Sequence, residues 1–273
     1  MKFIKTELGI FTQEVKQDSL SYPESGNDDC YAMEDNSQWF QARNQTLSSM
    51  MKKYPFDGDF IDIGGGNGYQ VNYLRKQGII NGKWILCEPG MSGCINAVSR
   101  GVEDVYNCSY EDFPFSDFNI GAVGLFDVIE HIKDPISFLK GIIDRVAVGT
   151  KIYITVPALQ SLWSEVDVIS GHFKRYNYQD VGELESKLSV KLQYRSYFFS
   201  YYVPFLFGLR VFPEKLGFKQ THEQIGKSEK SNHKANLTVN GILNWLHRKE
   251  LSKMVRGENL NFGTSMLLVF IKE

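Results

Sequence analysis

The chain has few cysteines, no long apolar run and no excess of either charge. Its 273 residues include four cysteines, and no two of them form a Cys-x-x-Cys pair. Since no cysteine or histidine spacing is typical of a metal site, the sequence predicts reduced, buried thiols and no resident metal. The first residues, Met-Lys-Phe-Ile-Lys-Thr-Glu, contain no apolar signal region, and no later run could span a membrane. These absences predict a cytoplasmic protein.

Charge and composition narrow the class of partner. The chain has 30 Lys and Arg against 32 Asp and Glu, a formal net charge of −2. A chain so close to neutral has no general attraction for a phosphate backbone, and the Asn-Pro-Pro-Tyr type of base-flipping motif is absent, so no nucleic acid is expected as a partner. Hydrophobic residues make up 42% of the chain, enough to fill the core of one α/β domain with elaborations.

The most informative segment is a short apolar strand that runs into a glycine-rich turn. Residues 59–69 read Asp-Phe-Ile-Asp-Ile-Gly-Gly-Gly-Asn-Gly-Tyr. The alternating residues in it are Asp62, Gly64, Gly66 and Gly68. Such glycines let the main chain close on a nucleoside, although a glycine-rich turn without a ligand is the alternative. Tyr69 stands where the dinucleotide fingerprint needs its third glycine, so the spacing favours a nucleoside with a short charged tail.

A carboxylate follows the next predicted strand. The apolar run 83–87 is closed by Glu88, about twenty residues after the last glycine of the turn. In a βαβ unit this places the acid at the carboxyl end of the second strand, within reach of the two hydroxyls of a ribose. A carboxylate only accepts hydrogen bonds, so it can take both. We therefore predict that Glu88 binds a nucleoside.

Strand and helix patterns alternate along the rest of the chain. Strands are predicted at 59–63, 83–87, 104–107, 119–126, 150–156, 190–199 and 264–271. Helices are predicted at 36–53, 67–77, 91–99, 134–147, 178–188 and 238–254. This order predicts an α/β, Rossmann-like, seven-stranded and mostly parallel sheet with helices on both faces. Ligands then bind at the carboxyl ends of the strands.

The predicted organisation has two parts. Residues 1–54 are expected to form an N-terminal extension with a lid helix, in which the polar and turn-rich residues 1–35 lie outside the core. Residues 55–273 are expected to form the α/β domain, with an insertion at about 200–262 before the last strand.

These features resemble class I S-adenosylmethionine-dependent methyltransferases of the small-molecule and lipid-precursor type, in the type 11/12-like branch. Three further blocks carry the resemblance: Tyr110-Glu-Asp-Phe-Pro-Phe115, Leu125-Phe-Asp-Val-Ile-Glu-His-Ile132 and Ile152-Tyr-Ile-Thr-Val-Pro157. The resemblance covers residues 55–176 well. It implies a methyltransferase that uses S-adenosyl-L-methionine, releases S-adenosyl-L-homocysteine and needs no metal.

The resemblance also implies which residues hold the cofactor. Asp112 matches the acid that takes the adenine amino group, and Phe113 would flank the ring. Arg43 on the lid helix would meet the cofactor carboxylate in a forked contact, with packing of this helix on the sheet as the alternative. For Asp62, a structural cap on backbone amides is equally open. The full predicted set is Asp62, Gly64, Gly65, Gly66, Gly68, Glu88, Pro89, Asp112, Phe113, Phe126, Asp127, His131 and Arg43.

Two histidines are candidates for a general base. His131 could serve in this role, or it could bond locally and shape the cofactor pocket. His172 is the first candidate, because the segment 162–176 follows the fifth strand and so lies over the mouth of the site. Residues predicted from this segment to bind the acceptor are Trp163, Asp167, His172, Arg175 and Tyr176. An ion pair between Asp167 and Arg175 that only holds the loop is the alternative.

The insertion bears on the acceptor. The aromatic run 197–212 is broken by Pro204, Gly208 and Arg210, so a spanning helix is not expected there. A strand followed by a core helix is one interpretation, and an apolar wall for a lipid-like acceptor or a peripheral membrane contact is the other. We predict methyl transfer to a small-molecule or lipid- or glycan-linked acceptor, without an obligatory protein partner. An NAD-type oxidoreductase and a non-catalytic cofactor-binding protein are the alternatives.

Overall fold

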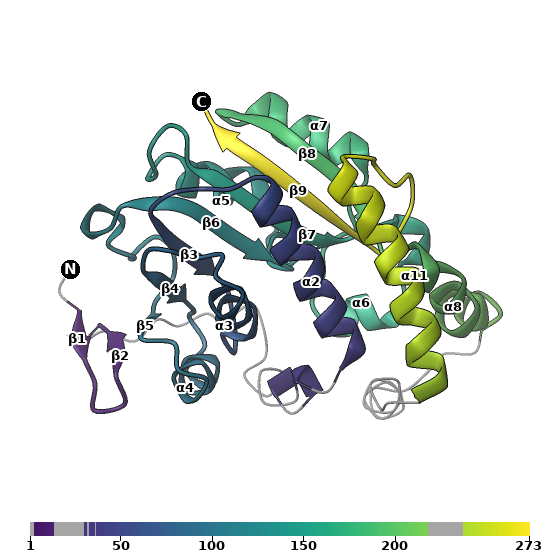
Figure 1. The fold of residues 1–273 in the computed structure, drawn as a ribbon, viewed down its shortest axis with the longest axis horizontal. Coiled ribbons are helices and arrows are strands. Elements are labelled where there is room, and N and C mark those ends of the chain that lie inside the picture. The colour runs from purple at the N-terminus through teal and green to yellow at the C-terminus, as the bar shows by residue number, and fades with distance from the viewer. Residues whose placement is uncertain (1–2, 14–29, 32, 36, 218–236) are drawn as a thin grey trace.

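A nine-stranded sheet forms the centre of the fold (Figure 1). The computed structural model describes residues 3–13, 30–31, 33–35, 37–217 and 237–273. The strand order is β1-β2-β5-β4-β3-β6-β7-β9-β8. The strands are β1 (Ile4–Lys5), β2 (Ile10–Thr12), β3 (Asp59–Ile63), β4 (Trp84–Cys87), β5 (Asp104–Asn107), β6 (Ile120–Phe126), β7 (Lys151–Pro157), β8 (Val190–Phe198) and β9 (Ser265–Lys272). Strands β2 to β7 pair in parallel, while β9 runs antiparallel to both β7 and β8.

Helices cover both faces of this sheet. One face carries α2 (Gln38–Lys53), α3 (Tyr69–Lys76), α4 (Met91–Ser99) and α11 (Leu237–Arg256). The other carries α5 (Pro135–Ile143) and α7 (Tyr178–Lys187). Helices α2 and α11, far apart in the sequence, lie side by side (Figure 1). In β3, Phe60 packs toward the first face and Ile61 and Ile63 toward the second, because successive side chains of a strand alternate.

Short helical segments complete the chain between the longer elements. They are the 3₁₀ turns η1 (Phe115–Asp117), η2 (Ile129–His131), η3 (Gln160–Leu162) and η4 (Ser200–Tyr202), the helices α6 (Glu165–Ile169), α8 (Val203–Leu206) and α9 (Phe212–Lys215), and the π-helix η5 (Phe207–Val211).

Two predicted helix starts are confirmed at the atomic level. The Asp134 carboxylate accepts a hydrogen bond from the Ser137 amide at 3.1 Å, and Pro135 occupies the first turn of α5. The Asn177 side chain accepts from the amides of Gln179 and Asp180, at 2.7 and 3.2 Å, at the start of α7. Local capping chemistry therefore sets both boundaries.

The seven predicted strands are confirmed, but the sheet is larger than predicted. The interpretation of the first 35 residues as lying outside the core is wrong for β1 and β2, which extend the sheet beyond β5. Ile10 is buried, and the Phe11 ring stacks on Tyr106 with centroids 4.6 Å apart. Strands of two and three residues are too short to give an alternating pattern, so the sequence alone carried no signal for them.

Other expectations have mixed outcomes. The thiols of Cys87, Cys94 and Cys108 are free and buried, as predicted, and Cys30 is partly exposed. Within the described ranges, every helix is too short or too polar to cross a membrane. The proposed division into 1–54 and 55–273 stays a prediction.

Candidate active site

A large cavity opens where the parallel strands end. Its volume is about 1720 Å³, whereas small-molecule sites typically measure roughly 300–1,000 Å³. Its lining includes the last residues of β3, β4, β6 and β7 and the residue after β5, which are Ile63, Cys87, Phe126, Pro157 and Cys108. A cavity of this size has room for two ligands placed side by side.

The glycine turn and Glu88 form one end of the cavity. The amide of Gly66 donates to Glu88 Oε2 at 2.9 Å, and the amide of Gly90 donates to Oε1 at 2.7 Å. Burial raises the pKa of Glu88, and the two backbone hydrogen bonds oppose this shift. A carboxylate has about four acceptor positions. Glu88 therefore orders the turn and can still accept hydrogen bonds from a ligand.

Only part of the predicted glycine set faces this cavity. Gly64, Gly65 and Gly66 line it. A Cβ at Gly65 would overlap Leu86 and the carboxylate of Asp62, so no larger residue fits without displacing them. Gly68 is not a lining residue. Its φ is 66°, and a Cβ there would lie 2.9 Å from the Cβ of Ala97, so this glycine allows α3 to begin close against α4.

Asp62 lies beneath the turn and not in the cavity wall. It is fully buried, and neither carboxylate oxygen accepts a hydrogen bond from the described residues. Burial raises its pKa to about 7, with Arg43 lowering it and Glu88 raising it further. The predicted alternative, a cap on backbone amides, is therefore not formed. Asp62 is not a lining residue of the cavity, and its direct contact with the cofactor stays a prediction.

Arg43 on α2 reaches the cavity and is already paired. Its Nη2 lies 2.7 Å from Asp127 Oδ2 and donates to Thr155 Oγ1 at 3.2 Å. Asp127 follows β6 and has a φ of 58°, which is unusual for a residue other than glycine and common at functional sites. Both residues line the cavity as predicted, while the forked contact of Arg43 with a cofactor carboxylate stays a prediction.

Of the two neighbouring residues predicted to contact adenine, Asp112 lines the cavity and Phe113 does not. Asp112, Pro89 and Phe126 line the cavity, and Asp112 is half-buried. Phe113 does not line it, so the structure gives no support to the prediction that its ring flanks a ligand. The Phe113 ring is buried and stacks on Phe118, with centroids 5.4 Å apart, as part of the core.

His172 is held in place by a hydrogen bond at the other end of the cavity. Its Nδ1 lies 2.9 Å from Asp167 Oδ1, and Arg175 Nε approaches the same oxygen at 2.8 Å. Although burial acts to raise the pKa of Asp167, the hydrogen bond from His172 and the charge of Arg175 hold it below its usual range. The Asp167–Arg175 ion pair holds the loop, and it also orients a histidine that lines the cavity.

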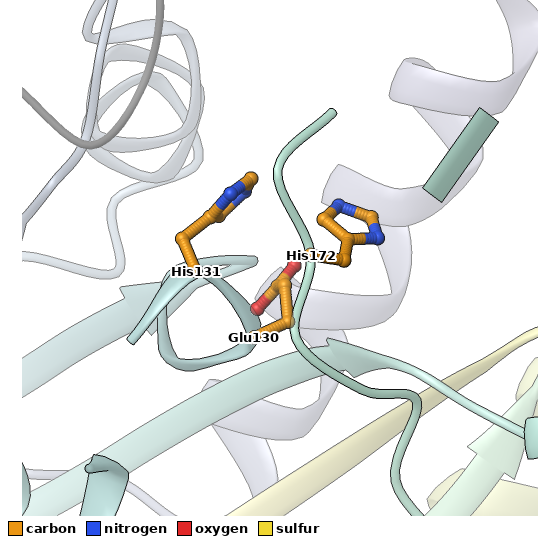
Figure 2. Close-up of side chains that lie close together, drawn as sticks. All are labelled: Glu130, His131 and His172. Atoms are coloured by element: carbon orange, nitrogen blue, oxygen red, sulfur yellow. The ribbon is translucent and has the colours of Figure 1, made fainter. Parts of the chain in front are cut away.

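His131 and Glu130 lie opposite His172 (Figure 2). The two imidazole centroids are 4.8 Å apart, in an edge contact. Burial, followed by the neighbouring His172, lowers the pKa of His131 to about 4. His131 is therefore neutral near pH 7 and a weak base. Glu130 also lines the cavity, is 1% exposed, and has a pKa that burial and Asp127 raise.

Two residues predicted to bind the acceptor do not line the cavity. The buried hydroxyl of Tyr176 donates to the carbonyl of Ile129 at 3.1 Å, so it ties the loop to η2. Trp163 is half-buried outside the lining. Both aromatic side chains therefore lie outside the cavity lining, whereas Asp167, His172 and Arg175 of the same loop line it.

Sequence reasoning missed a carboxylate beside the glycine turn. Glu34 lines the cavity, is buried against Arg100 in an ion pair, and accepts from Asn67 Nδ2 at 3.4 Å. No local pattern could reveal a contact between residues so distant in sequence. The apolar wall was foreseen only as a general interpretation of the insertion. Its cavity-lining members are Phe205, Leu206, Leu209 and Leu243.

Solved structures share this fold. A SAM-dependent methyltransferase of Thermotoga maritima is 12% identical with a TM-score of 0.54, over 91% of this chain and 96% of that one. The plantazolicin methyltransferase BamL, in complex with a triazolic desmethylPZN analog and SAH, is 15% identical with a TM-score of 0.52, over 92% of each chain.

A third structure is longer than this chain. Phosphoethanolamine N-methyltransferase 2 of Haemonchus contortus, in complex with S-adenosyl-L-methionine, is 16% identical with a TM-score of 0.50, over 84% of this chain. The match covers 52% of that protein, so the chain spans about half its length. At these identities, the three structures show a common fold.

Sequence comparison gives the family. No curated protein matches the chain. The family described as Methyltransferase domain matches residues 36–184, which contain the glycine turn, Glu88, the Glu130–His131 pair and His172. This match covers more than half of the chain and selects a methyltransferase over the oxidoreductase alternative. The chain belongs to this methyltransferase domain family.

Proposed function

We propose that the protein transfers a methyl group from S-adenosyl-L-methionine to a small-molecule or lipid-linked acceptor with an apolar body. The observation that carries this proposal is the single cavity that joins two chemically different ends. One end has the glycine turn, Glu88 and Asp112, and the other has Glu130, His131, His172 and the apolar wall. Two of the similar structures contain S-adenosylmethionine or S-adenosylhomocysteine.

The cofactor end fits an adenosyl group. Glu88 presents a buried acceptor for the hydroxyls of a ribose, and the half-buried Asp112 presents a second acceptor for an amino group. When bound, S-adenosylmethionine supplies a methyl group activated on a sulfonium. Because that charge is lost as the methyl moves, the protein mainly has to position both partners and exclude water.

The acceptor end combines polar and apolar surfaces. With Nδ1 held by Asp167, His172 has Nε2 available to accept a proton or hydrogen bond from an acceptor. His131 is less suited to this task, because its pKa is about 4. The apolar wall lies across the same cavity and fits an aliphatic or aromatic body.

The exposed surface around the wall supports the finer interpretation of the acceptor as lipid-linked. Apolar side chains of α8, η5, α9 and the residue after it are between 40% and 65% exposed: Phe205, Phe207, Leu209, Phe212 and Leu216. Such a patch fits a protein that meets its acceptor at a membrane surface. We therefore also propose a peripheral membrane contact at this end of the cavity.

Leu209 provides the test of the acceptor class. The protein is incubated with S-adenosylmethionine carrying a tritiated methyl group and with an extract of the cells that express it. We expect label in the organic phase. Leu209→Glu should reduce the rate of this labelling by about 10- to 100-fold, since burying a leucine is worth about 1.5–3 kcal/mol.

Val148→Glu is the matched control, because Val148 is 73% exposed and belongs neither to the cavity lining nor to the exposed apolar patch. Its labelling rate should stay near that of the wild type. Label found only in water-soluble products, at equal rates for both variants, would contradict an apolar acceptor. Absence of any labelled product, together with binding of S-adenosylhomocysteine, would favour the non-catalytic alternative.

A further inference from the structure

Glu130 is a buried carboxylate without a partner among the described residues. It lies in η2 directly after β6, is 1% exposed and lines the cavity. Neither Oε1 nor Oε2 accepts a hydrogen bond from a described residue. Burying a carboxyl group unpaired is costly, and buried charges are normally paired or coordinate a metal. A cation that enters the cavity would therefore find a carboxylate, that of Glu130, with which it can pair.

Two imidazoles lie beside this carboxylate (Figure 2). One ligand atom each from Glu130, His131 and His172 can be chosen so that all three lie within 4.8 Å of one another. His131 is adjacent in sequence, and His172 comes from the loop after β7. In Figure 2 the Glu130 carboxylate lies below the two rings, nearer to His172. A single ion can therefore be reached from all three side chains with small rotations.

The surroundings of His172 resemble those of a metal ligand. Asp167 Oδ1 holds His172 Nδ1 at 2.9 Å, and Arg175 fixes the same oxygen. Histidines that bind metals commonly donate their second nitrogen to a carboxylate, which fixes the ring and increases its basicity. Since Nδ1 is used in this way, Nε2 is the nitrogen left for an ion.

We propose that Glu130, His131 and His172 bind a divalent transition-metal ion at the acceptor end of the cavity. Two imidazoles and one carboxylate suit Mn²⁺, Fe²⁺ or Zn²⁺ and leave coordination positions open. The sequence predicted no metal, because two of the ligands are neighbours and the third lies about forty residues away, outside any familiar spacing.

A role for this ion rests on the proposed function. A bound divalent ion would take an acceptor hydroxyl at an open position and lower its pKa. The hydroxyl proton would pass to water, the new O–C bond would form as the S–C bond breaks, and S-adenosylhomocysteine would leave. His172 then acts as a ligand of the ion instead of a proton acceptor.

The test uses the metal alone. Full-length protein, without an affinity tag and treated with a chelator that is then removed, is titrated with Mn²⁺. Electron paramagnetic resonance follows the free ion. We expect one saturable site in the wild type. Glu130→Gln should weaken it by more than the roughly 10- to 100-fold typical of changes to residues that only support a ligand.

Control variants separate the site from general effects. Glu103→Gln removes an exposed carboxylate outside the cavity and should bind Mn²⁺ like the wild type. Glutamine has the shape of glutamate without its charge, so Glu130→Gln should melt near the wild-type temperature. His172→Asn is the second test of the site and should weaken Mn²⁺ binding in the same way.

The outcomes separate the site from the proposed function. No Mn²⁺ or Zn²⁺ binding to the wild type, or equal affinity in Glu130→Gln, would overturn the metal site. Methyl transfer that persists in a chelator, with no metal binding, would overturn the site and leave the proposed function intact. Specific metal binding without methyl transfer to any acceptor would support the site and count against the function.

Discussion

Replacing Gly66 with arginine should abolish binding of S-adenosylhomocysteine and leave the protein folded. Gly66 lines the cavity, its amide donates to Glu88, and its φ is 52°. A long side chain attached there competes with the ligand for the same space. The left-handed conformation adds a strain of about 1–3 kcal/mol for a residue other than glycine. Isothermal titration calorimetry measures the binding, and circular dichroism measures the melting temperature.

Gly78→Arg is the matched control for this prediction. Gly78 also has a positive φ, 68°, and a Cβ there would meet nothing within 4 Å. It follows α3 and does not line the cavity. This variant should have a similar backbone strain and should bind S-adenosylhomocysteine with wild-type affinity. Retained binding in Gly66→Arg, or equal losses in both variants, would remove the glycine turn from the cofactor site.

Replacing Asp167 with alanine should destabilise the protein by about 3–5 kcal/mol. Asp167 is 1% exposed, and Arg175 is 8% exposed. Without the carboxylate, the buried guanidinium has no ion pair with a described residue, and Ser164 loses the hydrogen bond from its amide to Asp167 Oδ2. Urea unfolding followed by circular dichroism measures the change in the free energy of unfolding.

Two further variants check the cause of this loss. Glu183→Ala breaks an exposed ion pair with Lys187 and should cost less than about 1 kcal/mol. Asp167→Ala combined with Arg175→Met removes both buried charges, so it should be less destabilised than Asp167→Ala alone. A double variant as unstable as the sum of the single changes would show that the ion pair does not hold the loop.

Local chemistry explains why much of the fold was predictable. Strands such as 59–63 and 83–87 are short, mainly apolar runs bounded by turn residues, and the structure has strands at 59–63 and 84–87. Asp134 and Asn177 begin helices through hydrogen bonds to amides only two or three residues away. These interactions connect residues only a few positions apart, so the sequence alone is enough to predict them.

The site was predicted less completely, because its contacts cross between distant segments. Asp112 and Phe113 are neighbours, yet one faces the cavity and the other the core. A loop has no fixed period that assigns alternate residues to opposite sides. The contact of Glu34 with Arg100 and the approach of Glu130 to His172 arise only from tertiary packing.

The loop after β7 shows the same limit in a different way. Its residue types predicted a binding surface. They did not show which side chains stabilise the loop and which line the cavity. The Tyr176 hydroxyl donates a hydrogen bond to a backbone carbonyl. His172 and Arg175 line the cavity, and both are held by hydrogen bonds to Asp167. The mixture of aromatic and charged residues therefore served two purposes, packing and the site.

A crystal structure with S-adenosylhomocysteine tests the central claim most directly. The account predicts the ribose hydroxyls within hydrogen-bond distance of Glu88 and the adenine amino group beside Asp112. It also predicts that the sulfur faces the space bounded by Glu130 and His172. A ligand bound elsewhere, or one whose sulfur points away from these residues, would contradict it.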